Sequence, residues 1–445
     1  MNFEETLSYL LSLGHETLAI KLGLRNTELL LESLSSPQKS FASVQIAGTN
    51  GKGSTAAMLD SISNAAGILT GLYTSPHLVS ITERIRIGGK EITEVDFAKY
   101  ATLVRKAAEE LLADGILEAL PTFFEQVTAI ALLAFREAGV SLAILETGLG
   151  GRLDATTVAG ATTVAITPLA LDHQEYLGET LVEIAAEKAA IIRPGVIAII
   201  APQPQPALDV ILRRCAECQV RPSVDECDSK IEDVTDEGRF TVTFATGAAD
   251  GRYENVVLGL LGEHQIGNVA VAIRLAESLR QRGFGISKAN IVKGVETARH
   301  PGRLELHGGQ PSLLLDGSHN PSGAQALRKY LDAFVKVPLT LVFGAMNDKR
   351  LEEIAGILFP VADRLVLTRP NNPRAATVDK LQDLARDVLE PNKIIPTRSP
   401  AEAMQKAGEC TPADGLICAT GSLYLVGEVK ALIETQELSE VVTRV

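Results

Sequence analysis

Short apolar runs separated by amphipathic stretches recur along most of this 445-residue chain, and this rhythm predicts strands that alternate with helices. In the amphipathic stretches, apolar positions recur as they do on one face of a helix. The expected helices are 1–37, 56–62, 92–112, 123–138, 180–192 and one that opens at 262–268 and runs towards 283. The expected strands are 41–47, 67–78, 140–145, 162–167, 312–315, 339–343, 365–368 and 416–419.

This alternation predicts an α/β fold with two domains. Strands and helices that alternate over roughly three hundred residues are typical of a doubly wound, mostly parallel sheet, which we expect within residues 1–298. Alternating polar and apolar residues over 220–256 indicate an antiparallel edge of the same domain. A short basic stretch with Pro and Gly at 297–302 marks the boundary. Residues 299–445 should then form a smaller, Rossmann-like α/β domain.

Composition and charge exclude several classes of partner. The net charge is −13, and aromatic residues make up 4% of the chain, with no tryptophan. Duplex binding needs a basic face and single-strand binding needs stacking rings, so we expect no nucleic-acid partner. The chain opens with no charged-then-apolar leader and has no apolar run of membrane length, which predicts a cytoplasmic protein without membrane contact. Five cysteines, an odd number, indicate reduced thiols rather than a disulfide framework.

A glycine-rich turn between the strand at 41–47 and the helix at 56–62 predicts a phosphate-binding loop. It reads Gly48-Thr49-Asn50-Gly51-Lys52-Gly53-Ser54. Glycines let backbone N–H groups converge on phosphate oxygens, and the helix N-terminus adds partial positive charge. Lys52 would neutralise the outer phosphates, and the Ser54 hydroxyl would reach the accompanying Mg²⁺. The spacing departs from the common G-x-x-x-x-G-K-[ST] loop, so a plain glycine turn is the alternative.

Two further residues suit a charged site at the ends of the strands. Glu146 follows the strand at 140–145, and a carboxylate there, beside a phosphate loop, is the usual place for a Mg²⁺ ligand. A helix cap or an ion pair is the alternative role for it. Lys188 falls on the apolar stripe of the helix at 180–192, where an unpaired lysine is costly. It could reach solvent, pair with a carboxylate or be carbamylated by CO₂, and the residues alone favour the first.

Several stretches, in order along nearly the whole chain, resemble the Mur-ligase superfamily and, within it, the folylpolyglutamate synthase and dihydrofolate synthase family. Besides the phosphate loop, they are Tyr73-Thr74-Ser75-Pro76-His77-Leu78 with Glu83-Arg84-Ile85, Pro121-Thr122-Phe123-Phe124-Glu125, and 148–156, 172–178, 187–195, 316–321 and 420–424. Thr157, Ala190 and Ser318 depart from the residues common in that family, and none of them is a proposed ligand.

The resemblance implies a set of binding residues. ATP would be bound by Asn50, Gly51, Lys52, Gly53, Ser54, Asn268, Arg303 and Asp316. Two Mg²⁺ ions would be held by Ser54, Ser75, Glu146, His173 and a carbamylated Lys188, and a monovalent cation is a further candidate ion. The pterin or folate would contact Pro76, His77, Arg84, Thr122, Phe123, Phe124, Glu125, Leu153, Asp154 and Ala155. The incoming glutamate would meet His319 and Ser422, and the catalytic residues would be Lys52, His173, Lys188 and His319.

The resemblance also implies a reaction. In this family ATP activates a carboxylate as an acyl phosphate, which the amine of L-glutamate then attacks. We therefore expect a monomeric ATP-dependent ligase that acts on dihydropteroate and on folates. A monofunctional folylpolyglutamate synthase is the main alternative, and a peptidoglycan-precursor ligase is a weaker one. A P-loop nucleotide switch without ligase activity is a third, which would hydrolyse ATP regardless of glutamate.

Some of these side chains also have purely structural interpretations. His173 could be an ordinary loop residue, and Ser422 is a plausible helix N-cap. Of Phe123 and Phe124, only one needs to face the pterin ring. Arg84 would be a surface residue unless it meets a carboxylate.

Overall fold

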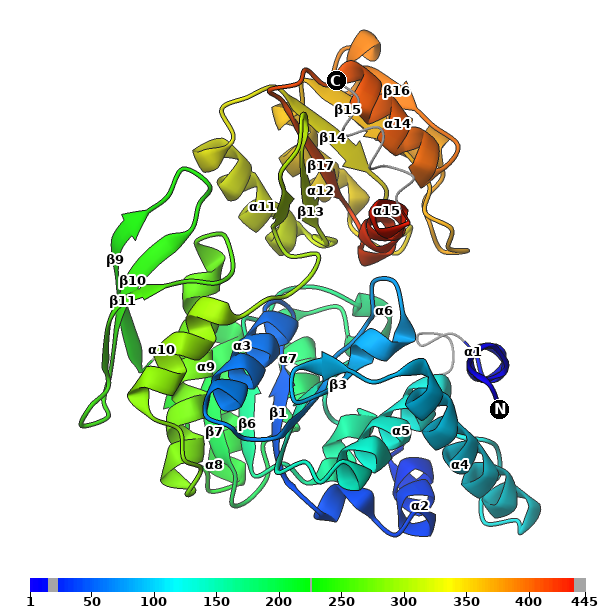
Figure 1. The fold of residues 1–445 in the computed structure, drawn as a ribbon, viewed down its shortest axis with the longest axis vertical. Coiled ribbons are helices and arrows are strands. Elements are labelled where there is room, and N and C mark those ends of the chain that lie inside the picture. Colours follow the sequence, from blue (N-terminus) through cyan, green and yellow to red (C-terminus); the bar gives the residue numbers. More distant parts are fainter. Residues whose placement is uncertain (15–22, 225, 436–445) are drawn as a thin grey trace.

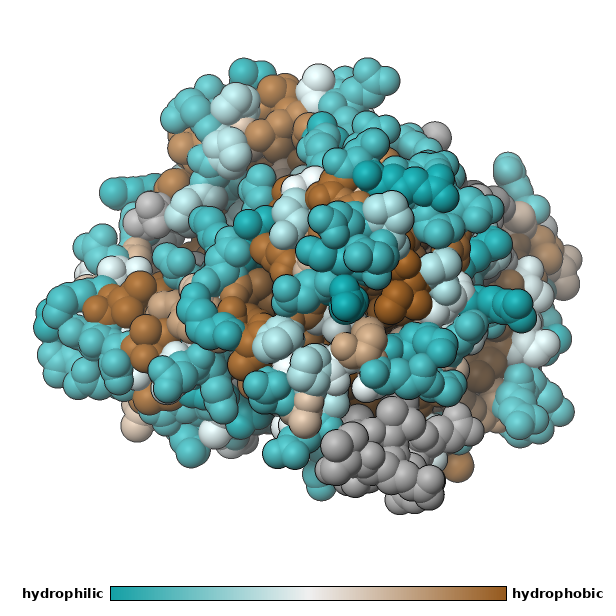
Figure 2. Space-filling model, turned by 90° about the horizontal axis from the view of Figure 1, so that it is seen from above, coloured by the Kyte–Doolittle hydropathy of each residue, from teal (hydrophilic) through white to brown (hydrophobic). Residues whose placement is uncertain are grey.

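The computed structural model describes residues 1–14, 23–224 and 226–435, which form two α/β domains, one above the other in Figure 1. The helical stretch expected over 1–37 contains α1 (Phe3–Ser12) and α2 (Arg25–Ser33), and its residues 15–22 lie outside the described part. Among the described residues, no helix combines the length and apolar character needed to cross a lipid bilayer. Seen from above, most of the surface is hydrophilic, and apolar residues show mainly in recesses (Figure 2).

The larger sheet has eight strands in the order β4-β3-β2-β5-β1-β6-β7-β8. Six strands run parallel: β1 (Ala42–Ala47), β2 (Thr70–Tyr73), β5 (Leu142–Glu146), β6 (Thr163–Ile166), β7 (Ile197–Ile200) and β8 (Ser223–Val224). At one edge, β3 (Ile85–Ile87) and β4 (Lys90–Glu91) pair antiparallel. The doubly wound, mostly parallel sheet expected from the sequence is confirmed.

Helices cover both faces of this sheet, and its central strands β5, β1 and β6 are buried along nearly their whole length. One face packs on α3 (Lys52–Ala65), α9 (His264–Gln281) and α10 (Lys288–Thr297). The other carries α4 (Glu94–Ala113), α5 (Phe123–Glu137), α7 (Leu181–Ala189) and α8 (Gln205–Glu217). Within β5, Leu142 and Ile144 join the first core and Ala143 and Leu145 the second, because successive strand side chains alternate.

Local signals set the ends of several helices. Thr93 caps α4 by accepting a hydrogen bond from the Asp96 N–H. Thr122 and Glu125 form a capping box at the start of α5. The helix expected over 180–192 ends earlier, at Ala189. A proline at 194 disfavours helical angles in the residue before it, so the chain leaves the helix ahead of that position.

The stretch over 220–256 contains antiparallel strands, as expected, but they form a separate sheet, and only β8 at its start lies at the edge of the large sheet, where it pairs parallel with β7. β9 (Cys227–Val234), β10 (Phe240–Thr246) and β11 (Arg252–Val257) form the separate sheet in the order β11-β10-β9. Its apolar face, which includes Phe240, Val242 and Phe244, joins the core around α9 and α10. The helices α9 and α10 bury this apolar face, so the three strands are stable as a separate sheet without pairing with the large one.

The second domain is built on a six-stranded sheet in the order β12-β13-β17-β14-β15-β16. Its strands are β12 (Glu305–His307), β13 (Ser312–Asp316), β14 (Leu339–Phe343), β15 (Arg364–Leu367), β16 (Ile394–Pro396) and β17 (Leu416–Thr420), of which only β12 pairs antiparallel. Two cores on opposite faces include α11 (Pro321–Phe334), α12 (Leu351–Leu358) and α13 (Val378–Arg386) on one side, and α14 (Pro400–Cys410) and α15 (Leu423–Glu434) on the other.

The contact between α10 and α3 predicts a stability effect. A Cβ on Gly294 would lie 2.2 Å from Ile62 Cα, so Gly294→Ala should overpack this contact and lower the free energy of unfolding by about 1–3 kcal/mol. Gly356→Ala in α12 is the matched control, because no atom lies within 4 Å of its added Cβ. Urea unfolding should show the control as stable as the wild type or slightly more so. Equal stability of the two variants would contradict the packing argument.

Candidate functional site

The glycine-rich turn leads from β1 into α3, at the edge where the parallel strands end. At two positions of the turn, only glycine fits, because any side chain would collide with a neighbouring residue. A Cβ on Gly48 would lie 1.9 Å from the Thr167 hydroxyl, and one on Gly51 would lie 2.2 Å from the Asn268 side-chain oxygen. Gly51 also has a φ of 86°, in the left-handed region. The turn therefore holds Asn268, from the distant helix α9, directly against the predicted phosphate loop.

Glu146, at the end of β5, lies beside this turn and is buried. Its Oε2 accepts one long hydrogen bond of 3.3 Å, from the Ser75 N–H, and a Cβ on Gly53 would approach that oxygen to 3.3 Å. Burial raises the pKa of Glu146, and the charge of Lys52 opposes this. No Lys, Arg or His of the described chain lies within ion-pair distance of it. A buried carboxylate with so little compensation suits a cation ligand better than a helix cap.

His300 also lies beside the phosphate loop, although no local sequence pattern predicts a role for it. Its Nδ1 lies 3.2 Å from the Ser54 hydroxyl, and its ring packs against Gly53, where a Cβ would lie 2.6 Å from its Cε1. Burial, followed by the charge of Arg303, lowers the pKa of His300 to about 3. The segment between the two domains thus contacts the loop directly.

Lys188 does not reach solvent, and the interpretation that the residues alone favoured is wrong. Only 5% of the residue is exposed, because α7 turns it towards the sheet with Ile184 and Ala185. Within the described residues no carboxylate pairs with it. Burial and then the charge of Lys52 lower its pKa to about 7, although Asp172 and Asp154 act the other way. A neutral amine is therefore well populated near pH 7.

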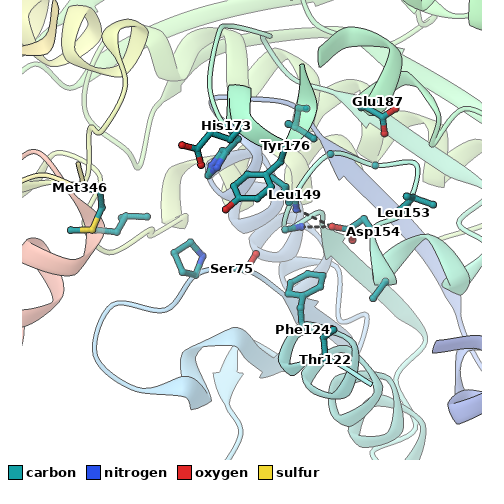
Figure 3. Close-up of a pocket in the computed structure, with 18 of the residues that line it drawn as sticks. Ser75, Thr122, Phe124, Leu149, Leu153, Asp154, His173, Tyr176, Glu187 and Met346 are labelled. Carbon is teal, nitrogen blue, oxygen red and sulfur yellow. Dashed lines mark hydrogen bonds between the residues drawn. The ribbon is translucent and has the colours of Figure 1, made fainter. Parts of the chain in front are cut away.

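A cavity of about 720 Å³ lies between the domains, next to these charged groups. Its walls include Ser75 and Phe124 from the first domain and Met346 from the second, with Tyr176 of the short helix α6 (Gln174–Leu177) over it (Figure 3). Of the residues expected to contact a pterin or folate, seven line it, namely Pro76, Thr122, Phe124, Glu125, Leu153, Asp154 and Ala155.

Three expected contacts lie elsewhere. Phe123 packs in the core with the Arg84 guanidinium 5.4 Å from its ring centre, and the Arg84 Nε donates to His77 Nδ1 at 2.8 Å. Successive helix residues point in different directions, so only one of Phe123 and Phe124 can face the cavity. Arg84 is buried, so the alternative interpretation of it as a surface residue is wrong.

Two carboxylates in the wall shape the cavity and do not present free charge to it. Asp154 Oδ2 accepts from the N–H groups of Gly148 and Leu149, at 2.8 and 3.0 Å (Figure 3). Glu125 accepts from the Thr122 N–H at 2.7 Å and from the Thr27 hydroxyl at 3.0 Å. Both hold backbone in place around the space that Phe124 faces.

Asp172 joins the two domains, a role that no local sequence pattern predicts. Its Oδ1 lies 2.6 Å from Lys349 Nζ, and Oδ2 accepts from the Asn320 amide at 3.1 Å. The same amide donates to the Asn50 side chain of the phosphate loop at 3.0 Å. His319 Nε2 lies 3.5 Å from Oδ2. Burial tends to raise the pKa of Asp172, but His319 and Lys349 outweigh it and hold that pKa well below its usual range.

The remaining predicted residues surround this junction. His173 adopts a φ of 52° at the start of α6 and lines the cavity, and burial is the main cause that lowers its pKa to about 3. Asp316 accepts from the Leu304 N–H at 3.0 Å, next to Arg303. Ser422 lines the cavity but also caps α15 and donates to the Gly344 carbonyl at 2.8 Å. Its helix-cap interpretation is confirmed.

Comparison with known proteins gives two family matches. Residues 46–276 match the Mur ligase middle domain, and residues 302–423 match the Mur ligase glutamate ligase domain. A dihydrofolate synthase/folylpolyglutamate synthase of Bacillus subtilis is 32% identical over 94% of this chain and 96% of its own length. A probable bifunctional folylpolyglutamate synthase/dihydropteroate synthase of Halobacterium salinarum is 36% identical over 97% of this chain. The chain spans about half the length of that relative, 51%.

Solved structures of similar fold cover nearly the whole chain. Mycobacterium tuberculosis folylpolyglutamate synthase complexed with ADP has a TM-score of 0.89 at 30% identity, covering 97% of this chain and 98% of its own. Escherichia coli FolC in complex with DHPP and ADP has a TM-score of 0.86 at 31% identity, covering 98% and 99%. A bifunctional folylpolyglutamate synthase/dihydrofolate synthase with Mn, AMPPNP and L-glutamate bound has a TM-score of 0.84 at 27% identity, covering 98% of each chain.

The junction around Asp172 predicts a pH-dependent stability. Asp172→Ala leaves Lys349 buried without its partner and should lower the free energy of unfolding by about 3–5 kcal/mol. Because the folded pKa of Asp172 is depressed, its contribution is present above the ordinary value of about 3.9 and is lost as pH falls through the depressed value. Urea unfolding should therefore show a constant gap from about pH 8 to pH 5.

A matched control and a double variant test the cause of that gap. Glu179 is an exposed carboxylate in the same part of the chain, and Glu179→Ala should change little. Adding Lys349→Ala to Asp172→Ala removes the stranded charge and should recover part of the loss. A gap that closes between pH 8 and pH 5 would contradict the depressed pKa.

Proposed function

The chain belongs to the Mur ligase family, in the branch of dihydrofolate synthases and folylpolyglutamate synthases. On this premise we propose that it uses ATP to join L-glutamate to dihydropteroate and to folates. The observation that carries the proposal is the cavity between the domains, which adjoins Ser75 and His173 beside the phosphate loop. A pterin-sized group and an amino acid can meet there next to a bound triphosphate. The relatives solved with ADP, AMPPNP, DHPP and L-glutamate support the same substrates.

ATP would lie on the turn at Gly51, Lys52 and Gly53, with Asn268, Arg303 and Asp316 contacting the rest of the nucleotide. Divalent metal is supported by the Mn-bound relative and by the buried, nearly unpaired carboxylate of Glu146. Mg²⁺ is commonly bound through one or two carboxylates together with phosphate oxygens, which fits this donor set. Ser54, Ser75 and Glu146 would hold a first ion, and Glu146, His173 and carbamylated Lys188 a second. When bound, the ions would neutralise phosphate charge and polarise the phosphoryl oxygens.

The residues of this chain would then mainly position reactants and exclude water. A substrate carboxylate attacks the γ-phosphate of ATP in line, which gives an acyl phosphate and ADP. Lys52 and the loop N–H groups hold the triphosphate for that attack. The amine of L-glutamate, held near His319 on the wall of the second domain, attacks the acyl carbonyl and expels phosphate. The contacts of Asp172 across the junction keep the two domains together, and this protects the acyl phosphate from hydrolysis.

Phosphate release tests the function directly. With ATP and Mg²⁺ present, we expect release with dihydropteroate and with tetrahydrofolate only when L-glutamate is also present. Release with tetrahydrofolate but not with dihydropteroate would identify a monofunctional folylpolyglutamate synthase. Phosphate release at the same rate with and without L-glutamate would instead indicate a nucleotide switch and would contradict the proposed ligase activity.

The role of Lys188 as a metal-ligand precursor gives a second prediction. Its neutral amine can attack CO₂, form an N–C bond and lose a proton, which yields a carbamate. Because its pKa is about 7, the reactive neutral form falls as the pH falls below that value, so activity should drop there and depend on added bicarbonate. Lys188→Ala should abolish turnover, and small carboxylic acids should partly restore it. Wild-type turnover in Lys188→Ala would refute the role, and an unchanged thermal midpoint would show that the fold is intact.

A further inference from the structure

The two domains are also joined by an apolar contact centred on Leu78. This residue lies in the loop after β2 of the first domain, yet it packs against the apolar core that holds Leu315, Val426 and Val429 of the second. A Cβ on Gly427 of α15 would lie 2.0 Å from the Leu78 carbonyl oxygen. Only a residue without a side chain fits at that place. Leu78 is therefore seated in a socket formed by α15.

The segment between the domains closes the other side of this socket. Gly302 has a φ of 69°, and a Cβ there would lie 3.0 Å from Leu78 Cδ1 and 3.2 Å from Val426 Cγ1. His300, two residues earlier, packs on the phosphate loop at Gly53. One short segment thus contacts both the Leu78 socket and the nucleotide loop.

The loop that carries Leu78 is held firmly within the first domain. The Glu83 carboxylate accepts from the N–H groups of Leu78, Val79 and Ser80, at 2.8, 2.7 and 2.7 Å. At the other end of the loop, the Ser75 N–H donates to Glu146. Three residues of chain span at most about 10 Å, so the Leu78 side chain and the Ser75 hydroxyl are closely linked. A shift at Leu78 can therefore reach Ser75 through only two intervening residues.

We propose that Leu78 is a positioning residue that couples the seating of the second domain to the placement of Ser75 at the nucleotide site. The inference rests on the proposed function, because it takes Ser75 to face the nucleotide and its cation. With α15 seated on Leu78, Ser75 stands beside Glu146. With α15 unseated, the loop loses one of its supports. By linkage, nucleotide bound at Ser75 must in turn favour the seated state of α15.

The test uses the full chain, ADP and Mg²⁺, and two readouts. Calorimetry gives the Kd of ADP, and amide hydrogen exchange gives the protection of residues 423–434 with and without ADP. In Leu78→Ala we expect Kd to rise on the order of tenfold, below the hundredfold that a 1 Å misplacement can cost in catalysis. ADP should protect α15 in the wild type and no longer protect it in Leu78→Ala. Val79→Ala, which truncates the exposed neighbour, is the matched control and should behave as wild type.

Two further variants separate coupling from simple loss of stability. Leu78→Met keeps the volume of the side chain and should retain ADP-induced protection. Gly427→Ala pushes on the same loop from the second domain and should raise Kd as Leu78→Ala does. If ADP protects α15 equally in Leu78→Ala and Val79→Ala, the coupling is wrong. If the wild type binds no ADP, the proposed function itself is wrong and the inference falls with it.

Discussion

The edge of the large sheet where the parallel strands end holds buried charged groups that lack full partners. Moving a charged group out of water raises the free energy of the folded state unless an oppositely charged or hydrogen-bonding partner offsets the lost hydration. Glu146 receives one long hydrogen bond, and Lys188 has no ion-pair partner among the described residues. Both lie near Lys52, whose charge influences the pKa of each. Glu146 lacks a positive partner and Lys188 lacks a negative one, so a bound cation, a phosphate or a carbamate would balance the charge of the site. These groups lie close together because the parallel strands of the sheet end at the same edge.

The second domain completes the same region in two chemically different ways. Asp172 makes polar contacts to Lys349 and Asn320, and Asn320 also reaches the phosphate loop at Asn50. Leu78 makes an apolar contact in a socket of α15. Apolar burial holds surfaces together without strict direction, whereas the buried polar contacts require one arrangement. The domains therefore meet in one register, with the cavity between them.

Structural and binding roles are divided among the side chains of the cavity wall. Asp154 and Glu125 use their carboxylates to hold backbone N–H groups, so they shape the wall and do not offer charge to a ligand. Phe124 faces the open space, while Phe123 supports it from the core. A cavity that combines apolar walls with charged side chains such as Lys349 and Arg374 is typical of a small-molecule binding site.

The sequence by itself determined the strand and helix alternation, the glycine-rich turn, the helix cap at Ser422, and the inward position of Lys188 on its helix. Each of these depends on residues a few positions apart, where backbone sterics and periodicity act. Only the tertiary structure decided that β9, β10 and β11 form a sheet of their own, that Lys188 is buried with no ion-pair partner among the described residues, and that Asp172 and Leu78 join the domains. Those outcomes depend on which surfaces pack together in three dimensions, and many of these surfaces lie far apart in the sequence. A local pattern shows that a side chain will be buried but not which other element will cover it.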